Sequence, residues 1–304
     1  MQLRGTLMLL LASFFWGTTF VAQMTGMDNL GPFSYAASRF TLGFIFLLAV
    51  WFSQSKNRQR EKRAGRYRSG FIAGIGSGLF MFIASSLQQV SMLYTTAGKA
   101  AFITCLYIVF VPLGAVILGR LIRVENWIGA FLALFGLYLL AIHEDFTFQI
   151  GDAILFVSSF FWTAQILFID KFASRVDALE LSVAQIFVCM VLSSIVMLIF
   201  ELPTLGAITN AWLPICYGGI LSAGVAFTLQ VFGQKYAEPA PAAILMSFES
   251  IFGAVSSWII LNEVMSGREI FGCVLMFIGV IVTQLRTLLI RPAIKSQADF
   301  KIGT

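Results

Sequence analysis

Ten long apolar segments occupy almost the whole chain, over residues 5–24, 32–52, 70–90, 98–118, 125–143, 151–170, 178–200, 212–233, 241–261 and 269–288. Each is close to the ~20 residues that a helix rising about 1.5 Å per residue needs to cross a ~30 Å hydrocarbon core. The runs are continuously apolar rather than alternating, and each is about twice as long as a barrel strand. They predict ten transmembrane α-helices.

The composition leaves too few polar groups to cover a surface that faces water. The chain is 59% hydrophobic and 12% charged, with a mean hydropathy of +0.88, whereas soluble domains carry about a quarter charged residues. The four cysteines lie apart in apolar segments and form no CxxC pair, which is typical of small core residues. We therefore expect an all-α integral membrane protein with the lipid bilayer as a partner.

The basic residues predict how the chain is oriented. With the N-terminus in the cytoplasm, all but three of the 20 Lys and Arg side chains fall in cytoplasmic segments; Lys99 and Arg268 lie outside and Arg39 lies within a helix. This distribution obeys the positive-inside rule and puts both termini in the cytoplasm. The basic run "SKNRQREKRAGRYRS" then sets topology and contacts anionic lipid, so we expect no nucleic acid partner.

The tetrapeptide "SFFW" occurs twice, over residues 13–16 and again 146 positions later over residues 159–162. Further along, the offset becomes 143, where Gly129 matches Gly272 and Gly136 matches Gly279. Recurrence at a nearly fixed offset over this length indicates a tandem duplication.

The duplication predicts two repeats, residues 1–145 and 146–290, followed by a cytoplasmic tail over residues 291–304. Each repeat holds five predicted helices, an odd number, so the second repeat enters the membrane from the opposite side. Inverted repeats related by a pseudo-two-fold axis in the membrane plane can exchange conformations, which opens a central site to one side and then the other.

Several longer stretches resemble a known family: "SFFWGTTFVAQ", "GPFSYAASRFTLG", "LQQVSMLYTTAGKAAFIT", "GDAILFVSSFFW" and "SFESIFGAVSSWIILNE". In this order, over roughly residues 5–288, they are similar to the EamA-type branch of the drug/metabolite transporter superfamily. The resemblance implies a ten-helix carrier of the bacterial inner membrane, with a central cavity between the first four helices of each half. It also implies export of amino acids, other small metabolites or drug-like compounds.

Two charged residues stand out because they lie well inside predicted helices, and a charge costs about 2.5–3.5 kcal/mol at the helix centre. Arg39 lies about seven residues into segment 32–52 and Glu249 about eight residues into segment 241–261. We expect Arg39 to bind an anionic group such as a carboxylate, and Glu249 to bind an amine or to couple transport to protons. The alternative for both is a structural ion pair that orients helices.

The other candidate substrate-binding residues are polar or aromatic and share helices or repeat positions with these two. Trp16 and Trp162 match in the repeat and lie near mid-depth, although helix packing explains them equally well. The remaining candidates are Gln23, Gln165, Gln185 (the repeat partner of Arg39), Tyr107 and Ser250. Pro112 predicts a kink in segment 98–118 that its repeat partner, Val255, does not share.

Enzymatic functions find no support in the sequence. The single histidine, His143, adjoins Glu144 and Asp145 at a helix end, a pattern typical of a solvated turn rather than a metal site. No HExxH, GxSxG, Walker or GxGxxG motif occurs in a suitable context. We expect no enzyme, no cofactor and no metal. Small-residue ridges such as Gly70, Gly74 and Gly78 suit a hinge or a homodimer surface.

These observations predict a secondary active transporter that works by alternating access. We expect export of amino acids or related amphipathic compounds across a bacterial inner membrane, with Glu249 as the proton-coupling group. Two alternatives stay open: an uptake or exchange permease for metabolites, and an uncoupled, channel-like facilitator. A channel is expected to show a continuous polar lining, whereas the polar groups here cluster at discrete depths.

Overall fold

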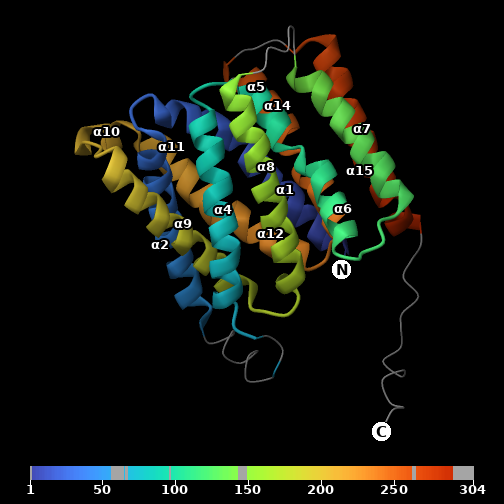
Figure 1. The fold of residues 1–304 in the computed structure, drawn as a ribbon, viewed down its shortest axis with the longest axis horizontal. Coiled ribbons are helices and arrows are strands. Elements are labelled where there is room, and N and C mark those ends of the chain that lie inside the picture. The colour runs from blue at the N-terminus through green and yellow to red at the C-terminus, as the bar shows by residue number, and fades with distance from the viewer. Residues whose placement is uncertain are drawn as a thin grey trace.

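The computed structural model describes residues 2–55, 65, 68–95, 97–142, 149–261 and 265–289. Their helices are α1 (Gln2–Met27), α2 (Pro32–Ser53), α4 (Phe71–Ser91), α5 (Ala97–Thr104), α6 (Tyr107–Ile117), α7 (Val124–Ala141), α8 (Ile150–Ala173), α9 (Ala178–Phe200), α10 (Leu205–Asn210), α11 (Trp212–Cys216), the π-helical η1 (Tyr217–Ala226), α12 (Phe227–Gln234), α13 (Pro239–Met246), α14 (Glu249–Leu261) and α15 (Gly267–Leu289). Figure 1 shows them as one bundle of roughly parallel and antiparallel rods. His143, Glu144, Asp145 and the predicted tail lie outside the described residues.

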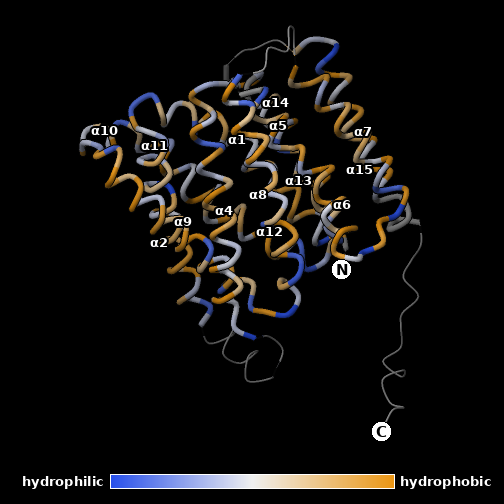
Figure 2. The backbone as a smooth tube through the Cα atoms, in the orientation of Figure 1, coloured by the Kyte–Doolittle hydropathy of each residue, from blue (hydrophilic) through white to orange (hydrophobic). Residues whose placement is uncertain are grey.

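Nine helical stretches in the described part of the chain are long and apolar enough to cross a bilayer. They are Leu3–Met27, Pro32–Ser53, Phe71–Ser91, Lys99–Ile117, Val124–Ala141, Ile150–Ala173, Ala178–Phe200, Trp212–Gln234 and Pro239–Ser256. They coincide with the first nine predicted segments, and Figure 2 shows apolar residues along most of their length. The prediction of an all-helical, multi-pass membrane protein is confirmed.

The outer surface of the bundle is apolar, as a hydrocarbon solvent requires. Ile72 and Ile117 are each 84% exposed, and Ile45, Phe131 and Phe277 also point outward. In water such a surface would be an aggregation hazard. Lipid tails make it favourable.

Two of the membrane-spanning stretches are interrupted at matching places. The stretch Lys99–Ile117 breaks between α5 and α6 at Cys105, and the stretch Pro239–Ser256 breaks between α13 and α14 at Ser247. In both, a tight i→i+3 bond closes the turn: Ile108 N donates to Cys105 O at 2.9 Å and Ser250 N donates to Ser247 O at 3.1 Å.

Pro112 lies inside α6, beyond the first break, and the kink expected at Pro112 stays a prediction. The first break comes before Pro112 in the chain, and α6 continues as helix through Pro112. The second half also has a break, although Val255 stands there at the position that matches Pro112. A helix break of this kind therefore occurs in both halves.

The glycine ridges are occupied by helices of the same chain. Gly74 and Gly78 of α4 face Leu181 and Gln185 of α9, so closely that a Cβ on either glycine would meet backbone atoms. On α7, Gly129 and Gly136 likewise face Gly279 and Gly272 of α15, which makes these two helices an antiparallel pair. These ridges let helices approach closely inside the chain, and they are not free as a homodimer surface.

Two carboxylates at the ends of α9 hold the N-termini of two neighbouring helices. Glu180 accepts hydrogen bonds from Gly70 N at 3.1 Å and Ser69 Oγ at 3.1 Å, at the start of α4. Glu201, which directly follows α9, accepts from Phe33 N at 3.0 Å and Ser34 N at 2.6 Å, at the start of α2. An anion at a helix N-terminus satisfies unpaired N–H groups and the helix dipole. Helices α2, α4 and α9 are thereby joined into one unit.

We expect Gly78→Ala to destabilise the protein, because the new methyl group would lie 2.9 Å from Gln185 O and 2.8 Å from Val188 Cβ. Overpacking of this kind costs about 1–3 kcal/mol. The melting temperature of the purified protein in detergent should fall by several degrees. Gly114→Ala is the matched control, since its methyl group would meet the tip of the Leu167 side chain and, at 3.9 Å, Thr163 Cγ2, and neither atom belongs to the backbone. Equal melting temperatures for the two variants would contradict the packing argument.

Candidate functional site

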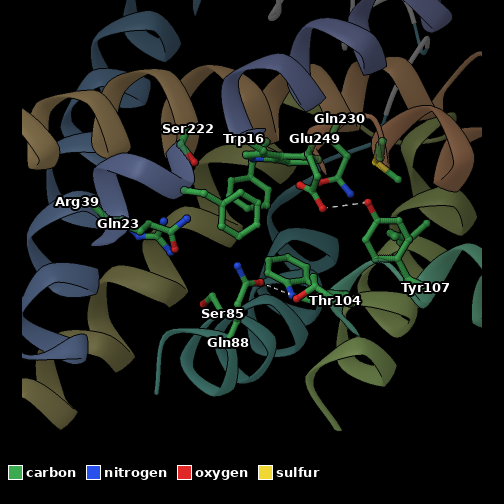
Figure 3. Close-up of a pocket in the computed structure, with 15 residues that line it drawn as sticks. Trp16, Gln23, Arg39, Ser85, Gln88, Thr104, Tyr107, Ser222, Gln230 and Glu249 are labelled. Atoms are coloured by element: carbon green, nitrogen blue, oxygen red, sulfur yellow. Dashed lines mark hydrogen bonds between the residues drawn. The ribbon is translucent and has the colours of Figure 1, made fainter. Parts of the chain in front are cut away.

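A cavity of about 60 Å³ lies in the middle of the bundle, between helices of both halves. Its lining residues are Trp16, Phe20 and Gln23 from α1, Arg39 from α2, Ser85 and Gln88 from α4, Thr104 and Tyr107 from α5 and α6, Trp162 and Ile166 from α8, Ser222 from η1, Phe227 and Gln230 from α12, and Met246 and Glu249 from α13 and α14. The space is several times what one water molecule needs. Figure 3 shows these side chains converging from all sides.

Glu249 is the first residue of α14 and stands at the second helix break, with 7% of its surface exposed. Its carboxylate accepts hydrogen bonds from Tyr107 OH at 3.1 Å and from Cys105 Sγ at 3.4 Å. Both donors belong to the first helix break, so the two interruptions meet at this carboxylate. Among the described residues Glu249 has no cationic partner, and its neighbours are neutral hydrogen-bond donors.

Arg39 projects from α2 and is 5% exposed. The guanidinium lies over the Phe40 ring at 4.6 Å and the Tyr35 ring at 5.7 Å, and its Nε has no hydrogen-bond partner. No carboxylate in the described part of the chain forms an ion pair with it. A buried cation that is neither paired nor fully hydrogen-bonded is costly, which points to a ligand that completes it.

The two charges lie at opposite ends of the cavity. Figure 3 places Arg39 beside Gln23 at one end and Glu249 beside Tyr107 at the other. The structural alternative for Arg39 and Glu249, a direct ion pair that orients helices, is not formed. The site therefore presents a separated positive and negative pole.

An aromatic wall lies between the poles. Phe227 is tilted against Trp16 at a centroid distance of 4.9 Å and stacks on Trp162 at 6.0 Å. Trp162 Nε1 donates to Gln88 Oε1 at 2.9 Å, a bond drawn in Figure 3. Aromatic faces of this kind accept apolar groups and cations.

Six of the nine predicted site residues line this cavity: Trp16, Gln23, Arg39, Tyr107, Trp162 and Glu249. The other three do not. Gln165 forms an amide pair with Gln230, Gln185 accepts from Ser77 Oγ at 2.9 Å between α4 and α9, and Ser250 contacts Cys105 Sγ at 3.4 Å. A role in substrate binding stays a prediction for all nine.

Five polar lining residues escaped the sequence analysis: Ser85, Gln88, Thr104, Ser222 and Gln230. Gln88 and Gln230 carried a usable signal, because each follows a leucine within an apolar helix and the two are 142 positions apart. That offset differs slightly from the 146 and 143 that the stronger matches defined, so the pair was overlooked.

No group of three or more His, Cys, Asp or Glu side chains that could hold a metal ion occurs among the described residues. The side chains that line the cavity suit binding by charge, hydrogen bonds and aromatic contact.

The sequence is similar to those of proteins named as uncharacterized transporters, and the fold is similar to that of a solved structure. An uncharacterized transporter of Archaeoglobus fulgidus is 27% identical over 94% of this chain and 87% of its own length. The uncharacterized transporter YoaV of Bacillus subtilis is 21% identical over 87% of this chain and 91% of its own length. A protein crystal structure with 21% identity matches 95% of this chain and 99% of that chain with a TM-score of 0.78, which supports the fold.

The sequence model of the EamA-like transporter family matches the chain twice, over residues 3–142 and 149–285. One match falls on each half of the chain, and together they cover most of it. The chain therefore belongs to the EamA-like transporter family, and it is a multi-pass membrane protein of that family.

Proposed function

We propose that this protein is a secondary active transporter that carries zwitterionic small metabolites, amino acids or related amphipathic compounds, by alternating access. The observation that carries the proposal is the pair of buried, uncompensated charges, Arg39 and Glu249, at opposite ends of one cavity. A zwitterion neutralises both at once. Neither a purely apolar solute nor a simple ion does so.

The substrate's carboxylate binds Arg39, whose planar guanidinium makes two parallel hydrogen bonds to such a group. The amine binds Glu249, and the carbon skeleton lies along Trp16, Phe227 and Trp162. Gln23 stands beside Arg39 and adds an amide to the carboxylate pole.

Reciprocal contacts between the halves support inverted repeats. Gly5 of α1 faces Gly233 O and Tyr236 Cβ. Its repeat partner, Gly151 of α8, faces Ser91 O and Tyr94 Cβ. A glycine of each half thus packs against the matching segment of the other half, as a two-fold axis between the halves requires. In this proposal α15 is the tenth membrane span, the repeats cover residues 1–145 and 146–290, and both termini lie in the cytoplasm of a bacterial cell.

Ion pairs at the two ends of α8 favour a carrier over a channel-like facilitator. Near the start of α8, Asp152 lies 3.6 Å from Lys99 Nζ and accepts from Thr95 Oγ1 at 2.7 Å. Near its end, Asp170 lies 2.5 Å from Arg120. Links at both ends of one helix suit gates that open alternately, whereas a channel must be open at both ends together.

Glu249 is the proposed coupling group. Its hydrogen-bond donors are the neutral Tyr107 and Cys105, so no cation among the described residues competes with a proton or a substrate amine for the carboxylate. Export is the direction that the family resemblance implies. A symmetric carrier can run either way, so the gradients of substrate and protons set the direction of net transport. A carrier that takes up or exchanges metabolites is the second candidate for the same site.

Arg39→Gln should weaken transport of zwitterions by about tenfold or more, mainly through a higher KM, because a charge-assisted hydrogen bond is lost. Counterflow of radiolabelled amino acids in proteoliposomes measures this. Arg175→Gln, which changes an exposed arginine, should leave counterflow intact. If Arg39→Gln transports amino acids as well as wild type, Arg39 does not bind the carboxylate.

Glu249→Gln should abolish the response of uptake to an imposed pH gradient, since an amide cannot take up and release a proton. Uptake into proteoliposomes with and without the gradient tests the variant against wild type. Glu238→Gln, at a largely exposed carboxylate, serves as the control. The same pH response in Glu249→Gln and wild type would remove Glu249 from the coupling step.

A further inference from the structure

The reciprocal packing identifies which residues of α4 and α12 correspond. Tyr94 and Tyr236 occupy equivalent places against Gly151 and Gly5, which sets an offset of 142 residues. At this offset Gln88 of α4 corresponds to Gln230 of α12. Trp162 of α8 corresponds to Trp16 of α1 at the offset of 146. All four side chains line the cavity.

The two matched pairs make different hydrogen bonds. Gln88 Oε1 accepts from Trp162 Nε1 at 2.9 Å. The counterpart bond between Gln230 and Trp16 is absent, and Trp16 Nε1 is buried with no hydrogen-bond partner in the described part of the chain.

Gln230 is instead held by Gln165 of α8. The two amides bond in both directions, with Gln230 Nε2 at 3.0 Å from Gln165 Oε1 and Gln165 Nε2 at 3.3 Å from Gln230 Oε1. The position that matches Gln165 in the first half is Thr19, whose hydroxyl donates to Phe15 O of its own helix. Thr19 therefore does not compete with Trp162 for Gln88, whereas Gln165 competes with Trp16 for Gln230.

We propose that Gln230 exchanges partners during transport, bonding Gln165 in the conformation described here and the indole N–H of Trp16 in the oppositely facing one. The inference rests on the proposed alternating access between inverted repeats. When the halves exchange conformations, α12 takes toward α1 the arrangement that α4 has toward α8, which includes the glutamine–tryptophan bond.

Gln165 is then a positioning residue that acts through Gln230. Its amide pair stabilises the present conformation, while the unpaired indole N–H of Trp16 destabilises it. The balance between these two effects sets how the protein divides between its two conformations.

A single reporter cysteine in the cavity measures this division. Ser85→Cys is placed in a chain whose four cysteines are replaced by serine, and a membrane-impermeant maleimide is applied to right-side-out and to inverted membrane vesicles. The ratio of the two labelling rates reports which side the cavity faces. Gln165→Met, which keeps the length of the side chain but removes the amide, should shift the ratio about fivefold toward the opposite side.

Two further variants make the test specific. Adding Trp16→Phe to Gln165→Met should reverse the shift, and Trp16→Phe alone should move the ratio the other way, because the donor is gone. Gln234→Met is the matched control: Gln234 also joins α12 to α8, donating to Ile166 O at 3.0 Å, yet it takes no part in the exchange, so the ratio should not change.

The inference is overturned if Gln165→Met leaves the ratio unchanged, if Gln234→Met shifts it equally, or if Trp16→Phe does not reverse the shift. Failure of the proposed function looks different. In that case the reporter cysteine would be labelled from one side only, both in the protein without further changes and in every variant. Counterflow of amino acids would also be absent.

Discussion

A polar group inside a bilayer has no water to bond, and this constraint shapes every level of the structure. It makes helices the only element that the apolar segments form, because each backbone N–H and C=O finds its partner within the segment. It turns Ile72 and Ile117 outward and gathers charged and amide side chains inward. Irregular backbone is then tolerated only where it faces protein or cavity, and the two helix breaks meet at Glu249 for that reason.

Close packing of small residues sets how the helices surround the cavity. Glycines bring α4 against α9 and α7 against α15, and the carboxylates of Glu180 and Glu201 fix the starts of α4 and α2. None of the side chains of α7 and α15 that the structure describes lines the cavity. Side chains from α1, α2, α4 and α8 converge on one space, and their depth is fixed by backbone contacts that tolerate little displacement.

The two halves contain similar helices but differ in the charged and hydrogen-bonding side chains that they place at the cavity. Arg39 corresponds to Gln185 at the 146-residue offset, and only Arg39 reaches the cavity. Trp162 has a glutamine partner and Trp16 has none. In the alternating access proposed above, these differences set which conformation is favoured and what binds between the halves.

The sequence by itself determined the membrane class, the nine spans found in the described part of the chain and six cavity residues, because hydropathy, helical length and the cost of a buried charge are local properties. Tertiary structure alone decided that Arg39 and Glu249 stand apart, that glycine ridges face partners within the chain, and that both halves break a helix. It also decided that Gln165 holds Gln230 rather than lining the cavity. These outcomes depend on which faces of distant helices meet, and a linear pattern of residues does not specify the rotation and depth of one helix against another.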